Sequence, residues 1–273
     1  LQFTRTGQSS NTTIAWNPAT GSIDSAQLSG VDAVIHMAGA GIGDKRWTDE
    51  YKKEILNSRV LGTKLIASAM AETSDGPKVL LSGSAIGIYG ESLTTEFNEQ
   101  SPIGHGFLAD VCAQWEAATE SASRAGIRVA HLRTGIVLSP AGGALAKLLP
   151  LFKLGAGGKM GSGKQWQSWI SIDDEVAAID YLLTANVTGA VNLTAPTPVT
   201  QAEFTKTLAK VLHRPSFLPV PSFGPKLLLG SELADALLFT GQKVMPEILQ
   251  MSGYAFKHSS LESALRSLLN KPS

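Results

Sequence analysis

Residues that could move a proton gather around one short apolar run of the sequence. Ser82 and Ser84 stand at its end, Tyr89 follows closely, and His105 comes before the next apolar stretch. A serine hydroxyl or a phenol can donate a proton to a carbonyl oxygen, and an imidazole titrates near neutral pH. We therefore predict Ser84, Tyr89 and His105 as candidate catalytic residues. A packing role for Tyr89 is the simpler alternative.

Alternating glycines mark a second candidate site. Gly39, Gly41 and Gly43 follow the apolar run at residues 31–37, VDAVIHM. Without a Cβ atom, the backbone there can approach a ligand closely or adopt a positive φ. Ligands of open α/β sheets bind at the carboxyl ends of the strands, so this turn is a natural place for one. A plain connection from strand to loop explains glycines alone equally well.

Strand and helix patterns alternate along the chain and must position these residues. Short apolar runs predict strands, and apolar residues at spacings of three to five predict helices, including one over residues 107–125. The alternation indicates an α/β fold with a doubly wound parallel sheet. We expect a dinucleotide-binding domain over residues 1–150. Residues 151–273 are expected to return strands to the sheet and to add a small C-terminal α+β subdomain that holds the substrate.

The composition favours small-molecule partners. The 273 residues include 23 Lys and Arg and 23 Asp and Glu, so no net charge attracts nucleic acid or an anionic membrane. The single cysteine, Cys112, cannot form an internal disulfide, and no apolar run reaches transmembrane length. We expect a cytoplasmic monomer or homodimer. No spacing of His, Cys and carboxylates suggests a metal site.

Several runs resemble the extended short-chain dehydrogenase/reductase superfamily, and within it the epimerase-family (YfcH-like) proteins. They span nearly the whole chain, and the most specific are SGSAIGIYG and GSGKQWQSWISIDD. The resemblance implies a Rossmann-like fold and an NADP-dependent oxidoreductase or nucleotide-sugar-epimerase-like enzyme acting on a small polar substrate. The alternative is a non-catalytic NADP(H)-binding sensor or interaction protein.

The sequence departs from this superfamily in two ways. Such proteins open with a strand, a glycine-rich turn and a helix, but residue 1 falls in the second strand, so roughly 25 to 30 residues of a first βα unit are expected to be missing. The superfamily also uses a Tyr-x-x-x-Lys pair. Alignment on Glu116 places Leu108 and Cys112 at those positions, and neither can exchange the proton. We expect a non-standard active site, with Cys112 as a buried structural thiol.

The resemblance also implies binding residues. Arg5 ends the first strand, where arginine favours the 2′-phosphate of NADP over the 2′-hydroxyl of NAD; a solvated arginine is the alternative. The full set implied for the cofactor is Arg5, Ala38, Gly39, Ala40, Ser82, Arg133, Thr134 and Gly135. The residues implied for the substrate are Trp47, Lys164, Gln165 and Trp169.

Overall fold

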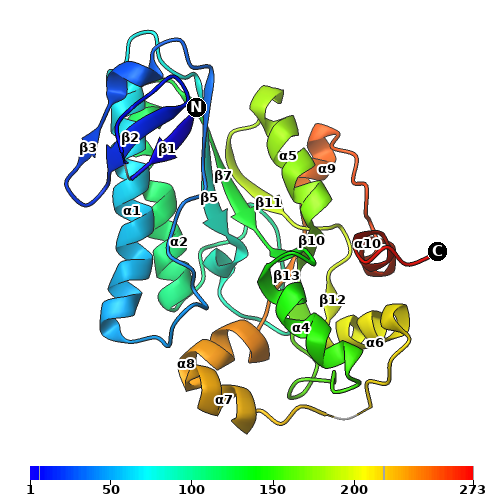
Figure 1. Ribbon diagram of the computed structural model, residues 1–273. Coiled ribbons are helices and arrows are strands. Elements are labelled where there is room, and N and C mark those ends of the chain that lie inside the picture. Colours follow the sequence, from blue (N-terminus) through cyan, green and yellow to red (C-terminus); the bar gives the residue numbers. More distant parts are fainter. Residues whose placement is uncertain (6, 218, 273) are drawn as a thin grey trace.

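A four-stranded parallel sheet runs through the centre of the protein (Figure 1). The computed structural model describes residues 1–5, 7–217 and 219–272. The strand order is β11-β7-β5-β4, and every neighbouring pair is parallel. The strands are β4 (Ala33–His36), β5 (Val79–Ala85), β7 (Arg128–Thr134) and β11 (Gly189–Leu193). Because they run in one direction, their carboxyl ends lie at one edge of the sheet.

Helices cover both faces of this sheet, which confirms the predicted doubly wound fold. One face carries α1 (Asp49–Glu72), α2 (Phe107–Ala117) and α3 (Glu120–Arg124). The other carries α5 (Ile172–Thr184) and α9 (Glu247–Ser252). On the first face Val34, Leu80 and Ile66 share one buried cluster, and on the second Leu81, Leu182 and Leu249 share another. Two apolar cores thus hold the strand ends in place.

A small second sheet precedes β4 in the chain. It joins β1 (Gln2–Thr4) to β2 (Thr13–Asn17) in parallel, and β2 to β3 (Ser22–Ile23) in antiparallel. Ile14 and Trp16 of β2 pack into the same core as α1. Within the described ranges, β4 pairs with β5 alone, and Ile35 on β4 remains 44% exposed.

The remaining elements extend the carboxyl edge. Strand β8 (Ile136–Leu138) pairs with β10 (Trp169–Ser171), β9 (Trp166–Gln167) with β12 (Val199–Thr200), and β6 (Glu96–Phe97) with β13 (Lys243–Val244). A separate core joins α4 (Gly143–Lys153), α6 (Gln201–Leu212) and α10 (Leu261–Leu268). The sheet takes β11 from beyond residue 150. The division of the chain at that residue and the substrate-holding subdomain remain predictions.

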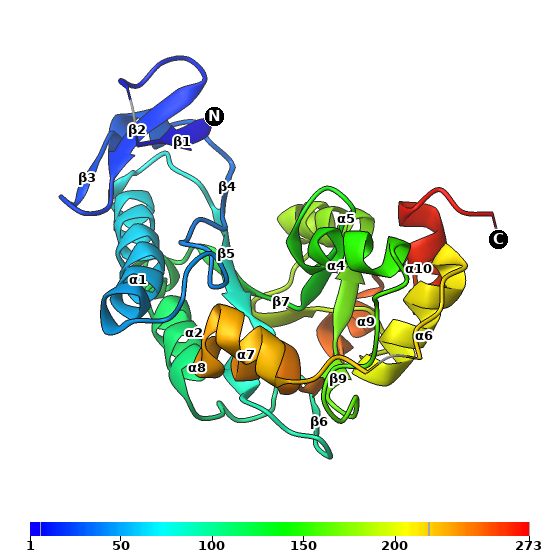
Figure 2. The same cartoon turned by 60° about the horizontal axis from the view of Figure 1, so that its bottom comes forward.

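An arm crosses toward the first group of helices. It consists of α7 (Phe223–Leu229), α8 (Ser231–Ala234) and the π-helical turn η3 (Asp235–Phe239). Figure 2 shows α7 and α8, in orange, beside α2. Lys52 of α1 forms an ion pair with Glu232 of α8 at 2.5 Å, and the Arg46 guanidinium donates to the main-chain carbonyls of Leu227 and Leu228. These contacts join the arm to the loop and helix that follow β4.

One predicted helix is wrong. The expected single helix over residues 107–125 is two helices, α2 and α3, because the Thr119 N–H donates to the Glu116 carbonyl, three residues back, in place of an α-helical bond to the fourth residue back. The Thr119 hydroxyl donates to the Glu116 carbonyl at 2.8 Å and lies 2.9 Å from His131 Nε2. A threonine whose hydroxyl bonds to nearby groups competes with regular helical bonding, and an apolar stripe alone does not reveal this.

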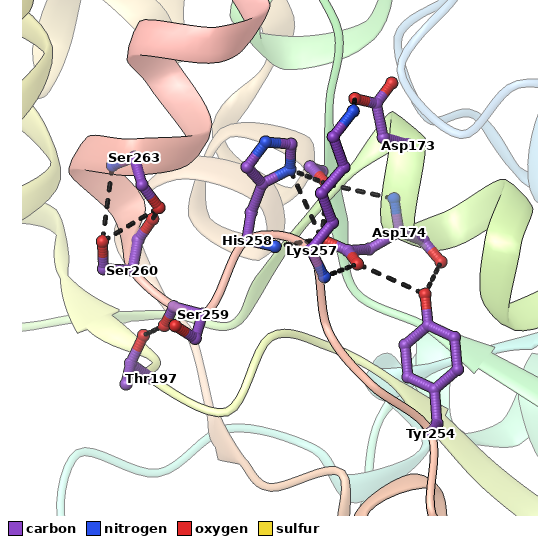
Figure 3. A network of polar contacts seen from close by, with 10 residues as sticks. Asp173, Asp174, Thr197, Tyr254, Lys257, His258, Ser259, Ser260 and Ser263 are labelled. Carbon is purple, nitrogen blue, oxygen red and sulfur yellow. Dashed lines mark hydrogen bonds and ion pairs between the residues drawn. The ribbon is translucent and has the colours of Figure 1, made fainter. Parts of the chain in front are cut away.

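Hydrogen bonds to Asp174 of α5 hold residues 254–258, in the segment before α10, against this helix (Figure 3). Its carboxylate accepts hydrogen bonds from the Ser171 hydroxyl at 2.8 Å and the Tyr254 hydroxyl at 3.2 Å. It also accepts from the main-chain N–H groups of Lys257 at 2.7 Å and His258 at 3.0 Å. Asp174 is 1% exposed, so these four donors replace the water that a carboxylate would otherwise bind.

We expect Asp174→Asn to destabilise the protein by about 2–4 kcal/mol, because the new amide donor would face a main-chain donor in a buried site. Urea unfolding measures this difference. The matched control is Asp173→Asn, since Asp173 is partly exposed and pairs with the exposed Lys257 at 2.6 Å. We expect the control to change stability by less than about 1 kcal/mol. Equal effects of the two substitutions would contradict the role given to Asp174.

Candidate active site

The largest of three cavities near the carboxyl edge of the sheet has a volume of about 550 Å³. Arg5, directly after β1, and residues Ala38, Gly39 and Ala40, after β4, line it together. Asn17, Pro18, Glu54, Asn57 and Ser58 are also in its wall. The structure thus brings into one space four of the residues predicted to bind the cofactor.

Gly39, Gly41 and Gly43, after β4, have no positive φ. At Gly39 and Gly41 the missing Cβ atom instead lets neighbouring side chains lie close to the backbone. A Cβ atom at Gly39 would lie 2.9 Å from Cζ of Arg59, and one at Gly41 would collide with the Asp44 carboxylate. The Ala40 N–H donates to the Ser58 hydroxyl at 2.9 Å. The backbone of this turn therefore lies directly against the side chains of α1, which leaves its other side open to the cavity.

A second cavity, of about 210 Å³, lies at the end of β7. Thr134 and Gly135 line it, and a Cβ atom at Gly135 would lie 2.5 Å from the Ser168 carbonyl oxygen. Leu108 and Cys112 form part of its wall. Burial raises the pKa of the Cys112 thiol to about 11, so it stays uncharged at neutral pH. Leu108 and Cys112, the positions that the resemblance assigns to the Tyr and Lys of the superfamily, therefore contribute an apolar surface to this cavity.

A third cavity, of about 250 Å³, adjoins the second. Trp47 and His105, predicted for substrate and catalysis respectively, both line it. Gly87, Leu108, Ala236, Thr240 and Gln242 line both cavities. Ala236 belongs to the arm, and Thr240 and Gln242 follow directly after it. Residues far apart in the sequence therefore form the wall that the two cavities share.

Ser84 and Tyr89 belong to a buried network centred on Arg133. The Arg133 guanidinium bonds to both carboxylate oxygens of Glu116, at 2.8 and 2.9 Å, and donates to the Tyr89 hydroxyl at 2.9 Å. The Ser84 hydroxyl donates to Glu116 at 2.6 Å, and the Tyr89 hydroxyl donates to the side-chain oxygen of Asn192 at 2.7 Å. Neither Ser84 nor Tyr89 lines any of the three cavities. Their predicted catalytic roles stay predictions.

Charge and burial act in opposite directions within this network. Burial pushes the pKa of Glu116 upward, but the hydrogen bonds from Arg133 and Ser84 outweigh it and hold this pKa below its ordinary value. Burial likewise opposes the charge on Arg133, yet the contact with Glu116 raises its pKa. For the Tyr89 phenol, burial dominates and raises the pKa, so the phenol stays protonated at neutral pH.

The other predicted residues are spread over different environments. Trp169 is fully buried and its indole N–H donates to the Thr197 carbonyl at 3.0 Å. The Gln165 amide donates to the carbonyls of Met160 and Leu238, Lys164 is exposed, and Ser82 is fully buried in β5. None of these four lines the three cavities, so the binding roles implied by the resemblance also stay predictions.

Two residues at the site had no signal in the sequence. Arg59 of α1 lines the second cavity, and Glu175 of α5 accepts a hydrogen bond from the Thr134 hydroxyl at 2.9 Å. Glu175 is 4% exposed, and its second oxygen has no partner within the described ranges. Burial raises the pKa of Glu175 to about 7. Arg59 and Glu175 lie within α1 and α5, in sequence patterns typical of any helix. The direction of each side chain becomes clear only from the packing of these helices on the sheet.

We expect Glu175 to make stability fall as pH rises. Its pKa is higher in the folded state than in the unfolded state, so the folded state binds the proton more tightly. The resulting stabilisation is complete below pH 4.5 and is lost as pH rises through about 7. Urea unfolding at pH 5 and pH 8 should show a contribution of about 2–3 kcal/mol, which Glu175→Gln abolishes. The exposed control, Glu72→Gln, should follow the wild type, and parallel curves for all three proteins would refute the assignment.

The sheet, its helices and the cavities at its carboxyl edge place the protein among Rossmann-like α/β proteins. The chain matches the NAD dependent epimerase/dehydratase family over residues 20–194 and a domain of unknown function (DUF1731) over residues 220–268. The chain therefore belongs to the NAD-dependent epimerase/dehydratase family. This confirms the resemblance seen in the sequence.

Relatives and solved structures support the same family. An epimerase family protein of Mycobacterium tuberculosis is 39% identical over 273 residues, which are 100% of this chain and 90% of that protein. The chloroplastic homolog of epimerase family protein SDR39U1 from Arabidopsis thaliana is 43% identical over 89% of this chain and 70% of its own length. The crystal structure of human SDR39U1 with NADPH has a TM-score of 0.85 at 32% identity, covering 98% of this chain and 90% of that chain. A nucleoside-diphosphate sugar epimerase from Corynebacterium glutamicum has a TM-score of 0.73 at 36% identity, covering 94% of this chain and 50% of that chain.

Proposed function

We propose that the protein is an NADP(H)-dependent oxidoreductase or epimerase-like enzyme acting on a small polar substrate. The observation that carries this proposal is that Arg5, Ala38 and Gly39 meet in one cavity at the carboxyl edge of the sheet. The human relative, whose structure contains NADPH, covers 98% of this chain at 32% identity. The protein would work as a monomer or homodimer in the cytoplasm.

The residues at the edge of the sheet fit this cofactor. The exposed Arg5 guanidinium would pair with the 2′-phosphate, and the backbone of Ala38, Gly39 and Ala40 would face the adenosine. Thr134 and Gly135 would border the nicotinamide, which supplies or accepts a hydride when bound. At Gly135 the lack of a Cβ atom lets the chain pass the Ser168 carbonyl and keeps this end of the cavity open.

Hydride transfer to or from a substrate carbonyl must be accompanied by the transfer of a proton. Leu108 and Cys112 cannot supply this proton, so another group must carry it. We assign this task to the Thr134 hydroxyl, which lines the second cavity and donates to Glu175. A carboxyl group with a pKa of about 7 can take up or release a proton at neutral pH, and Thr134 Oγ1 would pass it to the substrate. His105 in the adjoining cavity, and Ser84 and Tyr89 through the Arg133 network, are the alternative carriers.

The third cavity is the proposed place for the rest of the substrate. Trp47 offers a ring face for stacking, and His105, Glu91 and Gln242 offer polar contacts. Within the part of the chain that the structure describes, no helix could cross a membrane. The ring face and the polar groups of this cavity are compatible with a small polar substrate.

Titration with NADPH followed by a panel of carbonyl compounds and nucleotide sugars tests this function. We expect NADPH to bind. With a reducible carbonyl compound its absorbance at the nicotinamide band should fall, whereas with a nucleotide sugar and NADP⁺ an epimer should form with no net change in that absorbance. Thr134→Val should lower kcat about 100-fold while the Kd for NADPH stays within about threefold, as expected for loss of a proton carrier. Ser84→Ala and Tyr89→Phe are the comparison variants. Binding without turnover on any compound would instead favour the non-catalytic sensor.

Arg5→Gln should weaken NADPH binding about 10- to 100-fold, because one charge-assisted contact to the 2′-phosphate contributes roughly 1.5–3 kcal/mol. Binding of NADH, which lacks this phosphate, should change less than about threefold. Isothermal titration calorimetry measures both. The control is Arg124→Gln, which removes an exposed guanidinium on α3 that pairs with Glu120. An equal loss for the two nucleotides would remove Arg5 from the 2′-phosphate site.

A further inference from the structure

Arg59 lies between the first two cavities. Its side chain lines the second cavity and touches Gly39, which lines the first. Its Nη1 atom donates to the main-chain carbonyls of Ala40 at 2.9 Å and Ile55 at 3.0 Å. Its guanidinium carbon lies 5.1 Å from the ring centre of Trp115. These contacts hold the guanidinium at one place, where the turn after β4 meets the end of the sheet.

The guanidinium has no counter-charge. Within residues 1–5, 7–217 and 219–272, no carboxylate lies within ion-pair distance of Arg59, and Nε and Nη2 have no protein acceptor. It is also the only charged residue among those described in the wall of the second cavity. Half-buried arginines are normally paired, because removing their charge from water is costly.

Burial lowers the pKa of Arg59 relative to its ordinary value, which is the mark of a cation without full compensation. An arginine keeps its proton at neutral pH even so. The contrast with Arg133 is direct, since Glu116 bonds to that guanidinium through both oxygens. The buried Arg133 and the half-buried Arg59 thus lie at the same edge of the sheet, and the protein neutralises the charge of Arg133 alone.

We propose that Arg59 binds an anionic oxygen group at the junction of the two cavities, either the pyrophosphate of the cofactor or a carboxylate or phosphate of the substrate. This proposal rests on the proposed function, since it assigns the ligand of that site. Planar guanidinium donors at Nε and Nη2 suit two oxygens of one such group. Trp115 and Gly39 would fix the plane of the guanidinium before the ligand arrives.

Calorimetric titrations of Arg59→Gln separate the two sources. The probes are NADPH, adenosine 2′-monophosphate, which carries the 2′-phosphate without a pyrophosphate, and inorganic pyrophosphate. A further probe is malonate added to the NADPH-saturated protein. Arg124→Gln is the matched control, and Arg59→Lys tests whether a cation alone restores binding in part.

If the cofactor is the source, Arg59→Gln weakens NADPH and inorganic pyrophosphate at least tenfold and leaves adenosine 2′-monophosphate within about twofold. If the substrate is the source, NADPH is unchanged and malonate weakens at least tenfold. Values within about twofold of wild type for all four probes would overturn the proposal. If the wild type fails to bind NADPH, the proposed function fails, yet inorganic pyrophosphate still tests Arg59.

Arg59→Gln could disturb the fold, in which case the variant would also bind adenosine 2′-monophosphate more weakly. A measurement on the wild-type protein then tests the proposal. Phenylglyoxal modifies arginines, and mass spectrometry of peptides reports the rate at each one. NADPH or inorganic pyrophosphate, or malonate with NADPH present, should slow the modification of Arg59 several-fold and leave Arg124 unchanged. Equal rates with and without these anions would contradict the proposal.

Discussion

The buried ion pair between Arg133 and Glu116 holds the carboxyl edge of the sheet together. It joins β7 to α2, and through Ser84, Tyr89 and Asn192 it reaches β5 and β11. Removing one member of such a pair typically costs about 3–5 kcal/mol, since the other charge is left buried and alone. The cavities at this edge lie next to elements whose relative positions this pair sets.

The same pair also holds Ser84 and Tyr89, two residues predicted to be catalytic, in fixed positions. Ser84 and Tyr89 each make a hydrogen bond that satisfies a buried charge or amide, which fixes their hydroxyl groups away from the cavities. Sequence alone identifies a serine and a tyrosine at the end of a strand and predicts chemistry from their types. Ser84 lies on β5 and Tyr89 on the 3-10 turn that follows it. The partners of their hydroxyl groups, Glu116, Arg133 and Asn192, come from distant parts of the chain and are brought close only by the fold.

Local patterns were sufficient for most of the fold. At the start of α6 the Thr200 hydroxyl accepts from the Glu203 N–H while the Glu203 carboxylate accepts from Thr200, a complete capping box within four residues. The apolar run at residues 31–37 is likewise a local pattern, and it predicts the strand that the structure shows as β4. The arm of α7, α8 and η3 carried no such signal, because its contacts with Arg46 and Lys52 join positions far apart in the sequence. Long-range pairs of this kind cannot be read from periodicity.

The apolar wall at Leu108 and Cys112 changes where acid-base chemistry can occur. With a tyrosine and a lysine there, the proton carrier would lie on α2, over the first face of the sheet. Thr134, at the end of β7, donates instead to Glu175 of α5, and burial, not a neighbouring charge, raises the pKa of Glu175 to about 7. A carboxyl group tuned by burial needs no cationic partner to stay protonated. Through Thr134, Glu175 therefore places a group that can hold a proton beside the cavity whose wall includes Leu108 and Cys112.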